Sequence, residues 1–193
     1  MINKTVICFD IETTGLDPMG ELENGLQANS ERITTLCAID CKGKEYVLFD
    51  TDEKKLLKLV LEFFDNFENC LFTGYNIISF DIKFIYYRAM KYGLLTPKSH
   101  IHKLVYGVDK WHNPYVCDLA HIFSKGFNRH RKCQLVLKHL GLPTKINDGA
   151  EAIIMFEEKR FEELLDYCLN DAVVEMRLFN YCKEIGILNY YFR

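Results

Sequence analysis

Two acidic residues close a short apolar segment near the start of the chain. Asp10 and Glu12 lie two positions apart at the end of the segment TVICFDIE. Side chains at i and i+2 of a strand point to the same face, so both carboxylates are expected to converge. Two neighbouring carboxylates stay ionised only when their charge is compensated, and a divalent cation that prefers hard oxygen ligands would compensate it. A polar strand end without a metal is the alternative interpretation of this pair.

A third acid lies in a long amphipathic segment towards the C-terminus. Asp171 follows Tyr167 by four residues, which places both on one face of the helix predicted there. That face borders an apolar stripe, and a buried carboxylate is costly unless it has a partner. A metal ion is one candidate partner, and a core arginine or a backbone cap is the other.

Asp81 falls in the first turn of a predicted helix that follows a strand. The positive end of the helix dipole favours an acid there, which is the structural alternative to a metal ligand. Together with Asp10, Glu12 and Asp171, however, it makes a set of four. Such a set can hold two metal ions about 3.5–4 Å apart, which clamp the attacking and leaving oxygens of phosphoryl transfer.

The elements that would position these acids alternate between strands and helices. Apolar patterning predicts strands at about 5–12, 32–40, 45–50, 70–73 and 115–117, and helices at about 52–67, 79–90, 132–140 and 160–185. We expect the second and third strands to form a hairpin beside the first, Ser79 to cap its helix, and 100–114 to be irregular. The order predicts an α/β fold with a mixed five- to six-stranded sheet flanked by helices.

Composition limits the architecture and the compartment. The 193 residues fit a single domain over 1–193, and 49% hydrophobic with 26% charged residues predict a soluble globule. The net charge of −3 means that nucleic-acid binding would need a local basic patch. The eight cysteines contain no C-x-x-C pair and predict free thiols in a reducing compartment. The chain shows no signal-peptide layout and no membrane-spanning stretch, so a cytoplasmic location is expected.

Three ordered motifs contain these residues. The first is FDIETTGL from Phe9 to Leu16, the second is YNIISFDIKFI from Tyr75 to Ile85, and the third is Y-x-x-x-D from Tyr167 to Asp171. The chain resembles the DEDD superfamily of 3′→5′ exonucleases, which have a ribonuclease H-like, DnaQ-like fold. The second motif is closest to the proofreading domains of family B DNA polymerases. The tyrosine in the third motif is typical of the tyrosine subgroup (DEDDy), because the sister group has a histidine at the position of Asp166.

The resemblance implies a stand-alone, metal-dependent 3′→5′ exonuclease. It would hydrolyse terminal phosphodiester bonds of single-stranded nucleic acid, with DNA favoured over RNA, and release nucleoside 5′-monophosphates. Two divalent cations, Mg²⁺ or Mn²⁺, would be bound by Asp10, Glu12, Asp81 and Asp171, and Tyr167 would orient the attacking water. Two alternatives remain open, since a fold alone does not decide function: a catalytically silent nucleic-acid-binding module, and a ribonuclease acting on structured RNA.

Substrate contacts are expected from the first two motifs and from one basic segment. The resemblance implies nucleic-acid contacts by Thr13, Thr14, Gly15, Leu16, Asn76 and Phe80, where an ordinary turn and core packing are the alternatives. The dense basic cluster between Lys125 and Lys138 suits a single-stranded backbone, and a solvated loop is its alternative. Its predicted contact residues are Arg129, Arg131 and Lys132. The expected partners are single-stranded nucleic acid with a free 3′ end and a DNA polymerase or repair complex, with no membrane.

Overall fold

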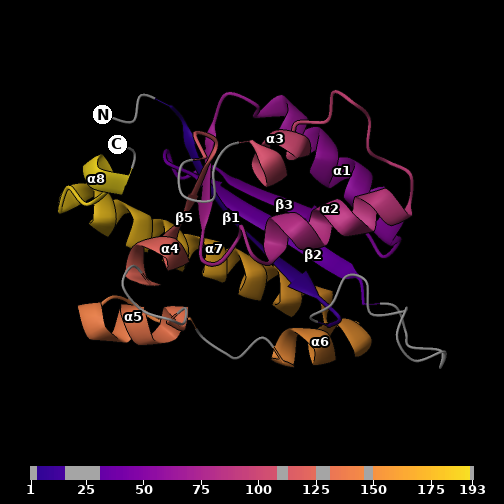
Figure 1. Cartoon of the computed structure of the whole chain (residues 1–193). Helices are drawn as coiled ribbons and strands as arrows, with labels where there is room; N and C mark the ends of the chain where they lie inside the picture. The colour runs from indigo at the N-terminus through magenta and orange to yellow at the C-terminus, as the bar shows by residue number, and fades with distance from the viewer. Residues whose placement is uncertain (1–3, 16–30, 108–112, 125–130, 146–149, 192–193) are drawn as a thin grey trace.

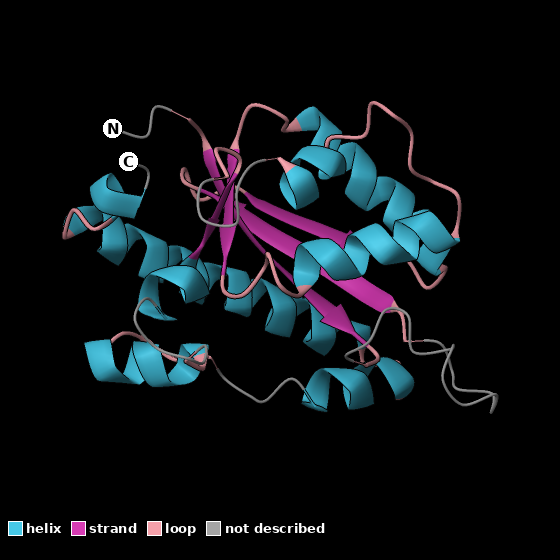
Figure 2. Cartoon of the chain, in the orientation of Figure 1, coloured by secondary structure: helices cyan, strands magenta, loops and turns pink. Residues whose placement is uncertain are grey.

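Within the described part of the chain, five strands form one mixed sheet in the order β3-β2-β1-β4-β5 (Figures 1 and 2). The computed structural model describes residues 4–15, 31–107, 113–124, 131–145 and 150–191. The strands are β1 (Val6–Thr13), β2 (Ile33–Asp40), β3 (Glu45–Phe49), β4 (Leu71–Gly74) and β5 (Val116–Asp118). The β1–β2 and β2–β3 pairs are antiparallel, whereas β1–β4 and β4–β5 are parallel. The predicted hairpin and the central place of the first strand are confirmed.

Helices cover both faces of this sheet (Figure 1). One face is covered by α1 (Glu53–Asn66), α2 (Asp81–Lys91) and α3 (Ile101–Tyr106). The other is crossed by the long helix α7 (Phe161–Glu184), which contacts β1, β2 and β4. On the α7 side also lie α4 (Leu119–Ser124), α5 (Cys133–Leu140), α6 (Ala150–Glu157) and α8 (Leu188–Tyr191). The architecture confirms the predicted α/β class with a mixed sheet.

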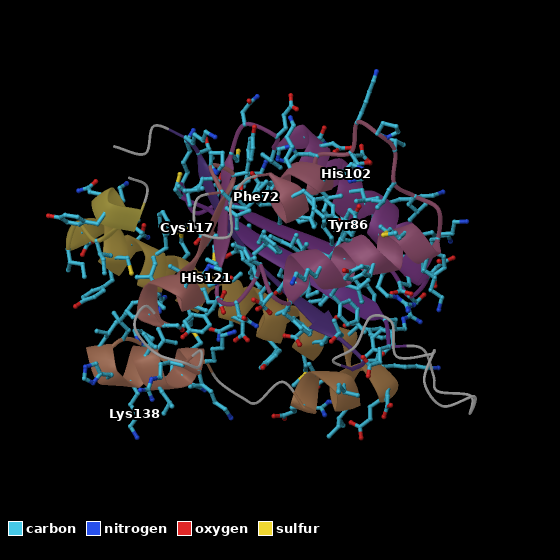
Figure 3. All side chains as sticks on the ribbon, in the orientation of Figure 1. Phe72, Tyr86, His102, Cys117, His121 and Lys138 are labelled. Atoms are coloured by element: carbon cyan, nitrogen blue, oxygen red, sulfur yellow. The ribbon has the colours of Figure 1, made fainter. Side chains whose placement is uncertain are left out.

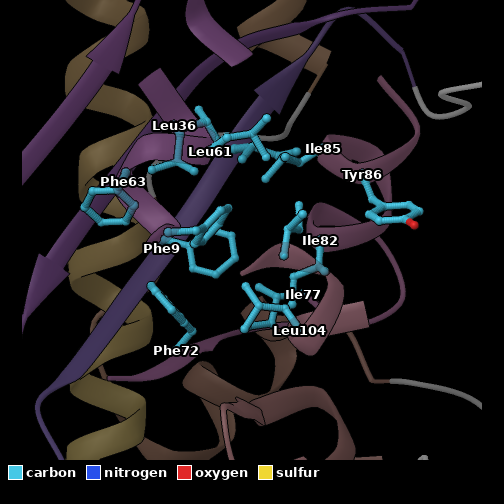
Figure 4. Packing of buried hydrophobic residues seen from close by; sticks show 14 of the residues in the cluster. Phe9, Leu36, Leu61, Phe63, Phe72, Ile77, Ile82, Ile85, Tyr86 and Leu104 are labelled. Atoms are coloured by element: carbon cyan, nitrogen blue, oxygen red, sulfur yellow. The ribbon is translucent and has the colours of Figure 1, made fainter. Parts of the chain in front are cut away.

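The alternation of side chains along β1 separates two hydrophobic clusters. Ile7, Phe9 and Ile11 belong to the cluster under α1 and α2, where the Phe9 ring packs against that of Phe72 (Figure 4). Val6 and Cys8 point to the opposite face and pack with residues of α7. Because strand side chains alternate with a period of two, the next residues on the α7 face are positions 10 and 12. The core thus turns both acids of β1 towards α7.

Two local expectations were wrong. The segment 100–114 contains helix α3, which is only six residues long and therefore too short to show a clear helical period in the sequence; it buries Ile101 and Leu104. Ser79 does not cap α2: the helix begins at Asp81, and Phe80 occupies the N-cap position without a side-chain hydrogen bond.

A buried ion pair joins α1 and α2, and a buried histidine directly precedes α3. Arg88 and Glu53 form a bidentate ion pair, with Nε to Oε1 at 2.8 Å and Nη2 to Oε2 at 2.5 Å, and both side chains are almost inaccessible. Glu53 Oε1 also accepts the N–H of Ile33 at 2.9 Å, which ties α1 to the start of β2. His100 is buried with its ring 5.4 Å from that of Tyr115.

All eight cysteines are free thiols, as expected; Cys41 is exposed and Cys133 is half-buried, whereas the other six are buried. None of the helices in the described ranges combines the length and the apolar character that a membrane crossing needs.

Candidate active site

The acids of β1 meet α7 across a short and well-defined interface. Cys168 Sγ of α7 donates to the backbone oxygen of Asp10 at 3.4 Å. Ligand atoms of Asp10, Glu12 and Cys168 all lie within 4.8 Å of one another. The pairing register of β1 with β2 shifts between Glu12 and Thr13, an irregularity of the kind that re-aims side chains beside active sites. The first motif and the third motif are therefore adjacent in space.

Asp81 joins the same site from the first residue of α2. Its Oδ1 accepts the backbone N–H of Ile11 at 3.2 Å, so the helix start is bonded to the strand that carries Asp10 and Glu12. Gly74 at the end of β4 permits the close approach of β4 to β1, since a Cβ there would lie 2.7 Å from the carbonyl oxygen of Phe9. Three separate motifs thus deliver their acids to one place.

Two buried carboxylates hold the loop that leads from β4 to Asp81. Asp118 Oδ1 accepts the N–H of Asn76 at 2.8 Å, and its Oδ2 accepts the N–H of Ile78 at 3.0 Å. Glu175 Oε2 accepts the N–H of Tyr75 at 2.8 Å. Asn76 has φ 69°, a conformation that few side chains adopt and that these bonds stabilise. The loop is therefore fixed from both sides.

Tyr167 lies on α7 with its ring in a small cluster under α6, formed with Ala152 and Met155. Burial raises the pKa of its hydroxyl, and the neighbouring charges of Asp171 and Glu12 raise it further. The phenol therefore stays protonated at neutral pH. It can donate and accept a hydrogen bond, but it is not a base.

The structure places one positively charged residue, Lys145, among these acids, and no sequence pattern predicts it there. Its Nζ lies 2.8 Å from Asp171 Oδ2, 2.9 Å from Glu175 Oε1 and 3.7 Å from Asp10 Oδ1. It follows α5 in a loop, where no spacing pattern marks it. Glu175 did leave a signal, because it lies four residues after Asp171 and so repeats the step from Tyr167 to Asp171.

Negative charge exceeds positive charge at this site. Burial raises the pKa of Asp10 to about 7 and that of Asp171 to about 6, while Lys145 opposes both shifts. Burial, followed by the charge of Asp10, also raises the pKa of Glu12 and of Asp81. Raised carboxylate pKa values mean that the ionised cluster needs further positive charge.

The residues present fit divalent cations. Oδ1 of Asp171 is buried and accepts no hydrogen bond within the described residues, while Oδ2 of the same carboxylate lies 2.8 Å from Lys145 Nζ. Buried acceptors are normally satisfied, and an exception calls for an explanation such as an ion. Carboxylate oxygens are the ligands that Mg²⁺ prefers and that suit Mn²⁺. Asp10, Glu12, Asp81 and Asp171 are the residues that would hold such ions.

The predicted contacts of the first motif lie at the end of β1. Thr13 donates its hydroxyl to the carbonyl of Gly15 at 2.5 Å. The Thr14 hydroxyl accepts the N–H of Arg32 at 3.0 Å. Both hydroxyls therefore form hydrogen bonds within the chain where β1 ends, as expected of the turn that was the alternative to nucleic-acid contact. Leu16 lies outside the described residues.

The other predicted contacts lie in or beside the loop of residues 75–80, which we call the clamped loop because Asp118 and Glu175 hold it. Asn76 and Phe80 belong to that loop, and the Phe80 ring, half-exposed, packs 5.6 Å from that of Phe84. The carbonyl of Arg131 accepts the Tyr75 hydroxyl at 2.5 Å, which brings the exposed Arg131 and Lys132 to this loop. Arg129 lies outside the described residues. Further along, Lys138 points outward from α5 (Figure 3).

A protein family matches most of the chain. Residues 26–185 match a family described as a predicted 3′–5′ exonuclease related to the exonuclease domain of PolB. That match begins beyond β1, so it does not include Asp10 or Glu12. A comparison with curated proteins found no match.

Among the solved structures that match is the family B DNA polymerase from the hyperthermophilic archaeon Pyrobaculum calidifontis. The two share 19% sequence identity with a TM-score of 0.68 over 93% of this chain. The chain spans only 24% of the polymerase chain, about a quarter of its length. The likeness shows the fold, a ribonuclease H-like α/β fold with the sheet and flanking helices described above.

Proposed function

The chain belongs to the family of predicted 3′–5′ exonucleases related to the exonuclease domain of PolB, and we propose that its site hydrolyses the terminal phosphodiester bond of single-stranded DNA. The observation that carries this proposal is the convergence of Asp10, Glu12, Asp81 and Asp171 beside Tyr167. A buried oxygen of Asp171 also accepts no hydrogen bond from the part of the chain that the structure describes. Tyr167 in the third motif supports assignment of the chain to the tyrosine subgroup (DEDDy) of these exonucleases.

The proposed roles are those that the resemblance to the DEDD exonucleases implies for these residues. Asp10, Glu12 and Asp171 would hold one divalent cation, and Asp10 with Asp81 would hold the second. Two such ions, when bound, would supply the positive charge that activates water and stabilises the leaving oxygen. Tyr167 keeps its proton, because burial and the neighbouring acids raise its pKa, so its hydroxyl orients the attacking water without deprotonating it. Water would add to the phosphorus of the terminal phosphodiester, and the bond from that phosphorus to the 3′ oxygen of the preceding nucleotide would break. The attacking water would give up its proton to solvent, and the 3′ oxygen would take one from solvent to become a hydroxyl. A nucleoside 5′-monophosphate would leave.

The substrate class is the finer part of the proposal. DNA is favoured because the related exonuclease domain belongs to PolB, a DNA polymerase family. A single strand suits the exposed cations Arg131 and Lys132 beside the clamped loop, since backbone phosphates bind basic grooves. A DNA polymerase or repair complex is the proposed partner, and residues 1–193 the proposed exonuclease domain. The free thiols suit a reducing compartment such as the cytoplasm.

The test is degradation of 5′-labelled single-stranded DNA and RNA of one sequence, with Mg²⁺, with Mn²⁺ and with chelator. The Asp10→Ala variant serves as the inactive comparison, and a binding measurement shows that it still holds the strand. We expect a ladder that shortens from the 3′ end, depends on metal and disappears in the variant. Undiminished degradation by Asp10→Ala would refute the assignment of the site. Binding without cleavage by the unmodified protein would instead favour a silent module.

A further inference from the structure

Glu175 is a buried acid that the proposed chemistry does not use. It lies one helical turn beyond Asp171 on α7, and its side chain is 1% exposed. One oxygen, Oε2, accepts the N–H of Tyr75, and the other, Oε1, lies 2.9 Å from Lys145 Nζ. A buried carboxylate is costly without partners. These two contacts place Glu175 between the lysine and the loop that leads to Asp81.

Lys145 is shared between two sides of the site. On one side are Asp171 at 2.8 Å and Asp10 at 3.7 Å, and on the other is Glu175. The backbone carbonyl of Lys145 is held by Gln134 Nε2 at 3.0 Å. The lysine side chain, in contrast, is a flexible four-carbon stem that carries a compact charge. The ammonium can therefore shift between these acids while its backbone stays in place.

A divalent cation bound by Asp10 and Asp171 would compete with this ammonium for the same oxygens. Two positive centres a few ångströms apart repel each other, most strongly where water is excluded. Of the acids that contact Lys145 in the described structure, Glu175 is the one without an assigned metal role. Its bond to Tyr75 keeps it in place as an alternative partner for the ammonium.

We propose that Glu175 is a positioning residue that holds the Lys145 ammonium at the edge of the site when divalent cations occupy Asp10 and Asp171. The inference rests on the proposed function in so far as those two acids bind metal. Without Glu175, the ammonium stays on Asp10 and Asp171 and opposes metal binding. Glu175 thus influences the metals through Lys145, and not as a ligand.

The experiment is a double-mutant cycle read out by Mn²⁺ binding in calorimetry. Glu175→Gln keeps a carbonyl oxygen for the Tyr75 N–H but presents an uncharged group to Lys145. Lys145→Met removes the ammonium, and the double variant combines both changes. Glu184→Gln is the matched control, because it removes the same charge from an exposed position of the same helix. Cleavage of labelled single-stranded DNA is measured in parallel.

We expect Glu175→Gln to weaken Mn²⁺ binding by about tenfold, the low end for groups that orient a metal site. Lys145→Met should tighten it, and Glu175→Gln should have little further effect in the Lys145→Met background. An equal loss in both backgrounds would show that Glu175 acts on the metal directly, and unchanged affinity would show that it is only structural; both overturn the proposal. If Glu175→Gln fails to fold, unchanged Mn²⁺ affinity of Lys145→Met overturns it. Mn²⁺ coupling without DNA cleavage would leave this inference standing and remove the exonuclease.

Discussion

Replacing Asp118 with asparagine tests how the loop before α2 is held. The carboxylate is fully buried and uses both oxygens: Oδ1 accepts from the N–H groups of Asn76 at 2.8 Å and Ala120 at 2.9 Å, and Oδ2 accepts from Ile78 at 3.0 Å. Asparagine has the same shape but one oxygen only. It can keep the two bonds of Oδ1, whereas its NH₂ group then faces the N–H of Ile78.

The cost follows from that mismatch. A buried donor left without an acceptor costs about 1–3 kcal/mol, and the two remaining bonds lose their charge assistance. An opposing effect exists, because burial raises the pKa of Asp118 despite its backbone hydrogen bonds, so a neutral side chain relieves some desolvation. We therefore expect a loss of about 1–3 kcal/mol in the free energy of unfolding. Since the same loop leads into Asp81, a displaced loop should also slow cleavage by at least about tenfold.

Urea unfolding measures the first effect, and cleavage of labelled single-stranded DNA at saturating Mn²⁺ measures the second. Asp52→Asn is the matched control: Asp52 caps α1 through one oxygen only, which accepts from Lys54 at 2.9 Å and Lys55 at 3.3 Å. Asparagine caps a helix as well as aspartate, so this variant should unfold like the unmodified protein. Equal stability and equal rate for Asp118→Asn would refute the reasoning. Lower stability with an unchanged rate would separate the loop from the placement of Asp81.

Three further predictions concern other parts of the molecule. Tyr167→Phe should slow hydrolysis without changing Mn²⁺ affinity, because only the water-orienting hydroxyl is lost; an unchanged rate constant in a single-turnover assay would make the tyrosine purely structural. Glu53→Ala removes the carboxylate that makes two hydrogen bonds to the buried guanidinium of Arg88, and should lower the free energy of unfolding by about 3–5 kcal/mol; a urea midpoint equal to that of the unmodified protein would contradict this. Burial lowers the pKa of His100, so the unfolded chain binds the proton more readily and stability is lost as pH falls below about 6.5. The stability difference between acidic and neutral pH should shrink in His100→Phe, and an undiminished difference would exclude this histidine as its source.

The sequence predicted the parts of the site that depend on local periodicity. Strand alternation placed Asp10 and Glu12 together, and helical spacing placed Tyr167 with Asp171 on the buried side of α7. The same spacing extends to Glu175, so its place on the buried side of α7 could also have been predicted. Lys145 could not be found in this way. Its position depends on how the loop after α5 returns to the sheet, where Gln134 holds its backbone.

The helices and strands divide in the same way, into those that a local sequence pattern predicts and those that depend on the rest of the fold. The hydrophobic pattern predicted β1 from a short apolar run, and it predicted α7 because that segment is long enough to show a helical period. Helix α3 gives fewer than two turns and relies on burying Ile101 and Leu104 against the sheet layer, which only the folded chain makes possible. The start of α2 was misplaced for a related reason. The chain there is held from outside the segment, by Asp118 and by the backbone of Ile11, so its own residues did not reveal where the helix begins.

Helix α7 fixes the spacing of three residues of the site. Tyr167, Asp171 and Glu175 are spaced by four residues, so they follow one another about 6 Å apart along the axis, each turned by about 40° from the one before. The thiol of Cys168 donates to the backbone oxygen of Asp10 and so anchors this side of the helix to β1. A substitution between these positions changes one contact, but inserting or deleting a single residue after Cys168 would turn everything beyond it by about 100° around the helix axis. Both acids would then leave the site together, so this stretch of the chain can vary in composition far more readily than in length.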